Sequence, residues 1–425
     1  MAGPGSLLDA LLEIAPADSG PDPAAIERLR LHLCDTIAAI ALGREEAGLP
    51  LLPPAADETL LRFAAAVRGS EIDDFHPQAC VTPGSVAIPA ALVIGMRRDA
   101  DDGRIATAML AGYEAMARLG FAIRGADIVH QGLWPTGLAA PIAASLIAAR
   151  LMALPDDSVA HALALAATRA SAAYAQGDPG GRLLLFGASV LEGVRCARLA
   201  AAGLKGDPSQ FERLLERCTG RGLDLGARRA PTFAGVELKP YCTSRQTLSA
   251  IEAALRCAAG RDPAAIDRIV VAVPPQHRAM VDRPRPSGGG AVASAQCQIA
   301  CALLRPDTLF RRRRDAELVD PDILAMMGRI EIVGDEALGA RYPALWAARV
   351  EIVFGAQRVS RLVERPREAD PPSWDMLARK LARILPDSTA TPLREAAQAF
   401  ATPGRPDTAA LLLRIAGDLL DPAGR

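Results

Sequence analysis

Residues 266–275 read IDRIVVAVPP, and the spacing of apolar residues changes at this stretch. Upstream of it, apolar residues recur every three or four positions, as they do in amphipathic helices. Within it, β-branched residues form a short run that two prolines end, as in a strand. The change therefore predicts a chain of two kinds of structure, a long helical part followed by a part that contains a sheet.

Further strand patterns follow downstream. They are 329–333 (RIEIV), 349–354 (RVEIVF) and 357–363 (QRVSRLV). Only Gly355 and Ala356 separate the last two runs, which predicts a hairpin. Helical patterns over 292–304 and 321–328 lie between the strands. We therefore predict a smaller α+β domain over residues 264–367.

The rest of the chain favours helices, because Ala and Leu are abundant and aromatic residues make up 4%. Helical periodicity is present in 24–42, 57–68, 86–97, 103–120, 137–153, 157–175, 187–203 and 246–259. A proline-rich stretch at 366–373 predicts a linker, after which 374–385, 390–400 and 406–419 return to helix. We predict a mainly α protein with a second α+β domain. Residues 1–263 form the first part of the helical domain, and 368–425 are expected to pack back on it.

The charge balance argues against several classes of partner. The formal net charge is −1, which gives no general attraction to nucleic acid or to an anionic membrane. The run Arg311–Arg314 is followed by Asp315 and Glu317, so we interpret it as a solvated patch. No clean apolar run of about 20 residues is present, which predicts no membrane span. The N-terminus lacks the basic region of a secretory signal, and with reduced thiols this favours the cytoplasm.

The cysteines and glycines predict neither a metal nor a nucleotide cofactor. The eight cysteines lack zinc-ligand spacing, and Cys297 and Cys301 fit the core of a helix. No GxGxxG motif follows a strand, and no phosphate-binding loop is present.

The first candidate site is Glu71-Ile72-Asp73-Asp74-Phe75-His76. A carboxylate beside His76 could fix the tautomer of the imidazole, as a general base requires. The alternative is a helix end with exposed acids. The following Thr82-Pro83-Gly84-Ser85 opens an apolar helix, whose start could bind an anion or be merely capped.

The second candidate is the loop Gln131–Gly137, which leads into another Ala-rich helix. Thr136 could cap that helix or bind a substrate oxygen, and Trp134 could line a pocket or belong to the core. The third is Gly177–Gly187, in which Arg182 follows a glycine-rich turn. Arg182 could pair with a carboxylate in bidentate fashion or be a solvated surface residue.

The fourth candidate is Lys239-Pro240-Tyr241-Cys242-Thr243-Ser244-Arg245-Gln246, directly before a helix. Lysine is rare here, occurring at positions 205, 239 and 380. Lys239 and Arg245 at the positive end of a helix repel each other and the helix dipole unless an anion lies among them. These starts of helices, if they converge, would suit a di- or tricarboxylate. Proton abstraction beside a carboxylate is the reaction class that then follows.

The order of these segments resembles that of the MmgE/PrpD family. The matching segments are 31–43 (LHLCDTIAAIALG), 71–92, 132–145, 186–206, 236–253 and 294–304 (SAQCQIACALL). The resemblance implies a large helical domain, a smaller α+β domain, a homodimer, and catalysis without a metal or organic cofactor. Family members eliminate water, lose carbon dioxide or move a proton at a carbon beside a carboxylate.

Roles carried over by this resemblance apply to individual residues. His76, Asp73 and Asp74 match the family's acidic-histidine segment, and Lys239 and Tyr241 match its KPY segment. Arg182 falls near a basic position of the family. The residues themselves favour substrate contacts from Glu71, Thr82, Trp134, Thr136, Arg182, Arg245 and Gln246.

The chain departs from the dehydratase and decarboxylase members at three positions. Thr82 and Trp134 stand where those members have histidines, and Cys297 stands where a tyrosine is common. We predict a lyase that acts on a small carboxylate. The alternatives are an epimerase or isomerase, which needs fewer acid–base groups, and a binding subunit that has lost catalysis.

Overall fold

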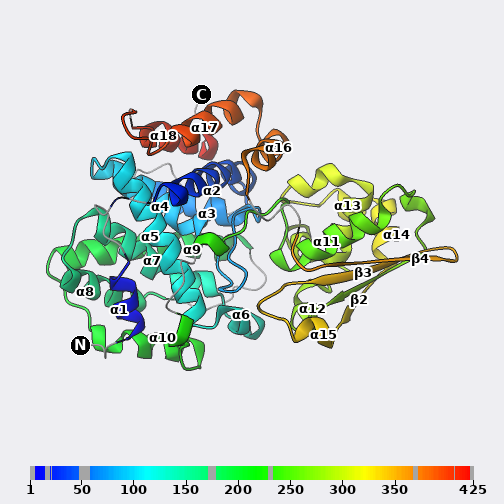
Figure 1. The fold of residues 1–425 in the computed structure, drawn as a ribbon, viewed down its shortest axis with the longest axis horizontal. Coiled ribbons are helices and arrows are strands. Elements are labelled where there is room, and N and C mark those ends of the chain that lie inside the picture. The colour runs from blue at the N-terminus through cyan, green and yellow to red at the C-terminus, as the bar shows by residue number, and fades with distance from the viewer. Residues whose placement is uncertain are drawn as a thin grey trace. The chain divides into compact units, whose positions relative to one another are not determined.

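The computed structural model describes residues 5–14, 20, 22–46, 58–170, 179–227, 233–366, 372–405 and 407–421. The chain divides into two compact units, which Figure 1 shows as a helical part and a part with a sheet. Unit 1 comprises Met1–Val236 and Ser373–Arg425, and unit 2 comprises Glu237–Pro372. The mainly helical architecture with a second α+β part is confirmed.

Unit 1 is built from helices. They are α1 (Leu7–Leu12), α2 (Pro23–Gly43), α3 (Thr59–Gly69), α4 (Gly84–Arg97), α5 (Asp102–Ala122), α6 (Gly125–Ile128), α7 (Pro135–Leu151), α8 (Asp156–Ala167), α9 (Pro179–Ala201), α10 (Phe211–Thr219), α16 (Trp374–Ile384), α17 (Asp387–Ala399) and α18 (Ala409–Leu420). Every residue of α7 is buried, which explains why its sequence is apolar on all sides. Helices α4, α5, α8 and α9 pack around it.

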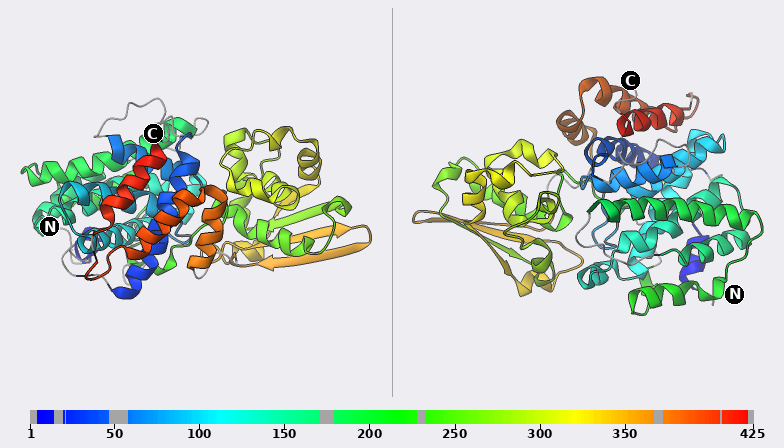
Figure 2. Two further views of the ribbon diagram at one scale, coloured as in Figure 1. Left: turned by 90° about the horizontal axis from the view of Figure 1, so that it is seen from above. Right: turned by 180° about the vertical axis from the view of Figure 1, so that it is seen from behind.

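Close packing of α9 on α7 depends on a glycine. A Cβ atom added to Gly193 would lie 2.1 Å from the carbonyl oxygen of Pro141, so no larger residue fits there. The C-terminal helices α16, α17 and α18 all pack on α2, and they lie beside it in both views of Figure 2. The last helices of the chain therefore complete the packing around one of the first.

Unit 2 holds a four-stranded sheet in the order β2-β1-β3-β4. Its elements are α11 (Arg245–Ala258), β1 (Arg268–Val273), α12 (Pro275–Val281), α13 (Ala295–Leu304), α14 (Pro321–Met327), β2 (Ile330–Gly334), α15 (Glu336–Gly339), β3 (Ala348–Phe354) and β4 (Gln357–Val363). Strand β1 pairs in parallel with β2 and antiparallel with β3, and β3 and β4 form the predicted hairpin. The strand predictions are confirmed.

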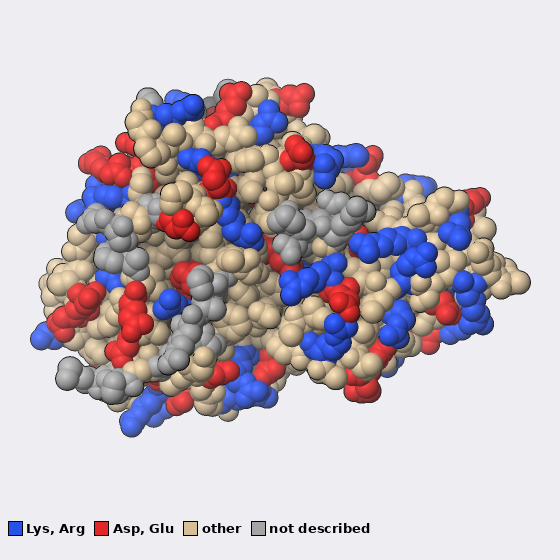
Figure 3. Space-filling view, viewed as in Figure 1, with Lys and Arg blue, Asp and Glu red and all other residues tan. Residues whose placement is uncertain are grey.

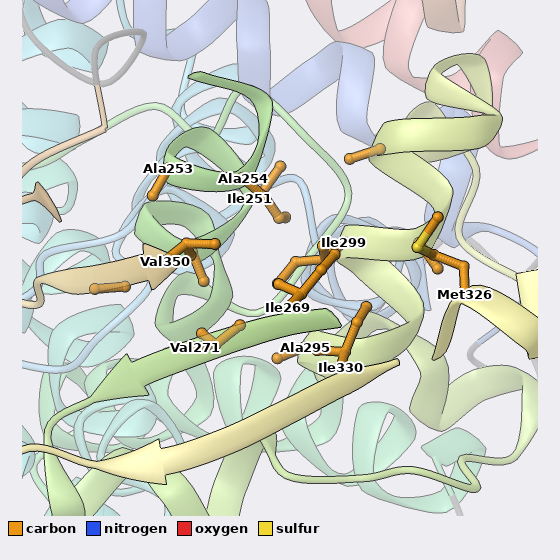
Figure 4. Packing of buried hydrophobic residues seen from close by; sticks show 14 of the residues in the cluster. Ile251, Ala253, Ala254, Ile269, Val271, Ala295, Ile299, Met326, Ile330 and Val350 are labelled. Atoms are coloured by element: carbon orange, nitrogen blue, oxygen red, sulfur yellow. The ribbon is translucent and has the colours of Figure 1, made fainter. Parts of the chain in front are cut away.

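The core of unit 2 lies on one face of the sheet. Alternate residues of β1 are buried, as expected for a sheet with one covered face. Figure 4 shows Ile251 of α11 and Ile299 of α13 close to Ile269 and Val350 of the sheet. Helix α11 therefore belongs to unit 2. The unit begins at Glu237, upstream of the boundary at residue 264 that the strand pattern suggests, because α11 buries its apolar side against β3 and β4.

The arginine run before α14 is only half solvated, which corrects our interpretation of it. Arg311 and Arg313 are exposed, whereas Arg312 and Arg314 are buried. Arg312 donates to the carbonyl of Gly289 (2.9 Å), and Arg314 donates to that of Cys242 (3.3 Å). Alternate guanidinium groups therefore tie neighbouring loops together, a use that the composition of the run does not reveal.

The surface and the helices bear on the predicted partners. Acidic and basic side chains are interspersed over the face seen in Figure 3. Within the described residues, no helix combines the length and the apolar character that crossing a bilayer requires. Cys297 and Cys301 lie buried on α13, with their sulfur atoms 4.0 Å apart, as expected for helix-core residues.

Candidate active site

The acidic segment 71–76 connects α3 to α4 and is almost wholly buried. Its first residue, Glu71, has a φ of 56°, a left-handed conformation that non-glycine residues rarely adopt. At its other end, the N–H of His76 donates to the carbonyl of Val81 (2.8 Å) in an isolated bridge. The segment is therefore an ordered turn inside unit 1, which differs from the alternative of a helix end with exposed acids.

Arg68, at the end of α3, holds the first two acids of this segment. Its Nη1 donates to both oxygens of Asp73 (3.0 and 3.2 Å), and its Nη2 donates to Glu71 (2.9 Å). Arg182 of α9 lies 3.5 Å from the same Glu71 oxygen. Two cations thus face two buried carboxylates, which is the pairing that buried charges require.

Trp134 joins this cluster from the start of α7. The guanidinium of Arg182 lies 4.9 Å from the centre of the Trp134 ring, a cation–π distance, and Phe186 packs at 5.3 Å. The structure therefore brings Glu71, Trp134 and Arg182 together. Arg182 lies within α9 rather than in a turn, and residues 177 and 178 of the glycine-rich stretch fall outside the described residues.

Asp74 faces the opposite direction, into the centre of unit 1. It accepts hydrogen bonds from His32 Nδ1 (2.8 Å), from the hydroxyl of Tyr113 (2.7 Å) and from the N–H of Gly84 (2.8 Å). Burial, followed by the charge of Asp74, raises the pKa of Tyr113 well above its ordinary value, so the phenol remains a donor. Asp74 thereby caps the start of α4, which favours capping over anion binding there, the two alternatives that the sequence left open.

Thr82 and Thr136, predicted from separate motifs, are neighbours. The N–H of Thr82 donates to the hydroxyl of Thr136 (3.2 Å), and both residues are buried. The hydroxyls of Thr82 and Ser85 lie 3.2 Å apart. This contact joins the starts of α4 and α7 on the side of the acidic segment.

The ring of His76 is oriented by backbone rather than by Asp74. Its Nδ1 accepts from the N–H of Ala79 (3.3 Å), and the ring packs edge-on against Phe121. A neutral imidazole that accepts at Nδ1 carries its proton on Nε2. A Cβ atom on Gly235 would lie 2.8 Å from that Nε2, so the backbone of residues 233–235 passes directly beside it.

A second buried ion pair lies behind the segment. Lys380 of α16 places its Nζ 2.5 Å from Oδ1 of Asp35 on α2 and donates to the carbonyl of Ile72 (3.0 Å). Burial raises the pKa of Asp35, and the Lys380 ammonium opposes that rise. The pair connects the C-terminal helices to the acidic segment.

In unit 2, the predicted residues gather at the N-terminus of α11. Arg245 is the first residue of the helix, and its Nε donates to Glu237 (2.6 Å). Among the described residues, its buried Nη1 has no hydrogen-bond partner, and its guanidinium lies 5.8 Å from the ring centre of Trp346. A buried guanidinium nitrogen without a partner is costly, which favours an anionic ligand at this position.

The neighbours of Arg245 are held in place by local contacts. Lys239 is buried, and its Nζ donates to the carbonyl of Thr243 (3.3 Å). Tyr241 is half-buried and packs against Phe310, with ring centres 5.9 Å apart. Gln246 is buried, and its amide contacts the sulfur of Met280 (3.7 Å).

Sequence reasoning did not identify five residues that hold the acidic segment. They are His32, Asp35, Arg68, Tyr113 and Lys380. The rarity of lysine drew attention to Lys380, but no local sequence pattern identifies the other four. Except for Arg68, these residues contact partners that are distant in sequence. Within the described ranges, no group of three or more His, Cys, Asp or Glu side chains is placed to hold a metal ion.

Comparisons with known proteins identify the family of the chain. The MmgE/PrpD N-terminal domain matches residues 54–220, and the MmgE/PrpD C-terminal domain matches residues 241–401. Over 115 residues the chain is 32% identical to cis-aconitate decarboxylase of Aspergillus terreus, with the same values for the protein of strain NIH 2624 / FGSC A1156. That match spans 25% of this chain and 23% of its relative. With both of its characteristic domains present in order, the chain belongs to the MmgE/PrpD family.

Proposed function

We propose that this protein is a lyase of the dehydratase or decarboxylase type, which acts on a small di- or tricarboxylate without a cofactor. The family to which it belongs contains dehydratases and decarboxylases of carboxylates. The observation that carries the proposal is the buried Nη1 of Arg245 at the start of α11, for which no residue in the described part of the chain is a hydrogen-bond partner. A carboxylate would satisfy this donor and would be stabilised by the helix N-terminus.

In the proposed reaction, a proton moves at a carbon beside a carboxylate. His76 is assigned as the proton donor, because the Ala79 N–H at its Nδ1 leaves the exchangeable proton on Nε2. Lys239 and Tyr241 are the proposed acid–base groups of unit 2, and Arg182 and Arg245 are the proposed carboxylate ligands. Trp134 supports the guanidinium of Arg182 by a cation–π contact at 4.9 Å.

A specific observation also favours an epimerase or isomerase. Thr82 forms hydrogen-bond contacts with Thr136 and Ser85, and Trp134 packs in an aromatic and cationic cluster. Neither Thr82 nor Trp134 supplies an acid–base group. Elimination from a citrate-like substrate would use more proton-transfer residues than this site then offers. Proton removal and return at one carbon requires fewer such residues. The remaining alternative, a binding subunit without catalysis, retains the same carboxylate ligands.

Proton NMR in deuterium oxide tests these proposals. The protein is mixed with a panel of di- and tricarboxylates and amino-dicarboxylates, and the variants Lys239→Ala and His76→Gln are compared with Lys205→Ala, which removes an exposed lysine. We expect deuterium uptake beside a carboxylate with wild type and Lys205→Ala, but not with the other two. Formation of an alkene or loss of carbon dioxide identifies a lyase, and inversion without either identifies an epimerase. No exchange by folded wild type across the panel would contradict both catalytic proposals.

A further inference from the structure

Lys380 reaches the acidic segment from a distant part of the chain. It lies on α16, yet its Nζ donates to the carbonyl of Ile72 at 3.0 Å and pairs with Asp35 at 2.5 Å. Lys380 is 3% exposed and Asp35 is 0% exposed. The side chain therefore contacts both α2 and the segment that bears the proposed proton donor.

Docking of a helix alone does not account for this pair. Helix α16 already buries Met376, Leu377 and Leu381 in unit 1. Replacing a buried ion pair by apolar residues of similar size is often neutral or stabilising, so a second function for the charge is expected. The contact with Ile72 supplies one, because it is directed at a single peptide group.

The peptide that Lys380 holds is unusually placed. Ile72 lies between Glu71, whose φ is 56°, and Asp73, which is bound by Arg68. A left-handed non-glycine residue persists only when its surroundings hold it. The N–H of Ile72 donates to the hydroxyl of Ser70 (3.2 Å), and its carbonyl accepts from Lys380. The N–H and the carbonyl of Ile72 are therefore both held by residues other than the acids of the segment.

We infer that Lys380 is a positioning residue. It fixes the peptide of Ile72 and thereby sets the directions in which Glu71, Asp73 and His76 project. Asp35 balances the charge of the same ammonium. The catalytic consequence of this arrangement rests on the proposed function, whereas the positioning itself does not.

Hydrogen–deuterium exchange of peptides covering residues 70–81 tests the inference on the full chain without a substrate. Lys380→Met removes both contacts and retains the aliphatic stem, whereas Asp35→Asn removes the ion pair and retains the Ile72 contact. Arg150→Met is the matched control, since buried Arg150 binds the carbonyls of Leu12 and Ile14 and the carboxylate of Asp156, remote from the segment. We expect Lys380→Met to raise exchange in 70–81 at least about tenfold. Asp35→Asn and Arg150→Met should raise it much less at comparable loss of stability.

Activity supplies the second measurement once the NMR panel has given a substrate. Lys380→Met should then lower kcat more than it raises KM, while Arg150→Met should leave both near wild type. Unchanged exchange in 70–81 would overturn the inference, as would equal rises in all three variants. Raised exchange in Lys380→Met alone would support the positioning role of Lys380. This holds even if the wild-type protein proves inactive, because inactivity would refute the proposed function and not the positioning role. If Lys380→Met does not fold, the double variant Asp35→Asn/Lys380→Met, which removes both charges of the pair, serves in its place.

Discussion

The hydroxyl of Tyr113 is one of three donors to Asp74, and its removal gives a graded test of that buried carboxylate. Tyr113→Phe preserves the ring and leaves His32 and Gly84 as donors. We expect a loss of about 1.5–3 kcal/mol in the free energy of unfolding, the usual contribution of a hydrogen bond to a charged group. Urea unfolding measures it, and a change within error of zero would show that the bond contributes nothing net.

Gly235 leaves room for the ring of His76, because it carries no Cβ atom. Gly235→Ala should displace either the imidazole or the backbone of residues 233–235. We therefore expect a loss of about 1–3 kcal/mol in the free energy of unfolding, together with loss of the deuterium exchange proposed for His76. Gly417→Ala is a control for substitution itself, because no described atom beyond its own stretch of helix lies within 4 Å of the position that its methyl group would take. Full activity of Gly235→Ala would argue against a role for Nε2.

The pH dependence of Lys380→Met follows from Asp35. Burial raises the pKa of this acid, and Lys380 opposes the rise, so the variant has the higher pKa. Its folded state then binds a proton more readily than its unfolded state does. The loss of stability, about 3–5 kcal/mol for a broken buried pair, should be largest at neutral pH and shrink as the pH falls through the raised pKa. Urea midpoints of wild type and Lys380→Met between pH 5 and 8 measure this difference in stability. A difference that grew as the pH fell would contradict the raised pKa of Asp35.

Single residues show where sequence reasoning reaches its limit. The acids 71–74 and His76 could be found because they cluster locally, as could Lys239 and Arg245 before a helix. The partners of Asp74 and Asp35 could not, since His32, Tyr113 and Lys380 meet them only after the helices pack. A local pattern identifies the charged segment, but only tertiary structure shows what holds each charge.

At the scale of elements, the bidentate contact of Arg62 on α3 with Asp421 joins α3 to the end of α18. The hydrogen bond from Arg62 lowers the pKa of Asp421, which is half-exposed. Asp421→Asn should lower stability by less than about 1 kcal/mol. The contribution is complete above the ordinary pKa of 3.8 and is lost as the pH falls through the lowered value. Glu331→Gln, in the exposed pair with Arg268, is the control and should have a smaller effect.

Elements with a strong period were the ones that sequence predicted well. The strands emerged from alternation, and most helices of unit 1 from apolar spacing. Helix α10 was not identified, because its charged residues dominate its short length. The pattern over 157–175 extends past α8, which ends at Ala167; residues 168–170 are not helical, and 171–175 lie outside the described residues. The sequence pattern placed helix α11 with the helical part of the chain, whereas α11 packs on the sheet of unit 2. Periodicity shows that a face is apolar but not which surface covers it.

For the whole molecule, the division of the chain predicts different behaviour for its parts. A fragment of residues 237–372 contains all of unit 2, so it should unfold cooperatively in urea. A fragment of residues 1–236 lacks the helices that cover α2 and should show a broad, weak transition. Circular dichroism measures both, and adding a peptide of residues 373–425 should sharpen the second. Independent, cooperative folding of 1–236 would contradict the importance of α16–α18.

The same discontinuity has a consequence for biosynthesis. Val236 leaves the ribosome before any residue of unit 2, and Ser373 follows only after the whole of it. At about 5–20 residues per second, the nascent helical part waits on the order of ten seconds for its last helices. During this interval the apolar side of α2 that α16–α18 later cover is open to chaperones, while the sheet can complete its own folding. Translation of this chain thus finishes the second unit before the first.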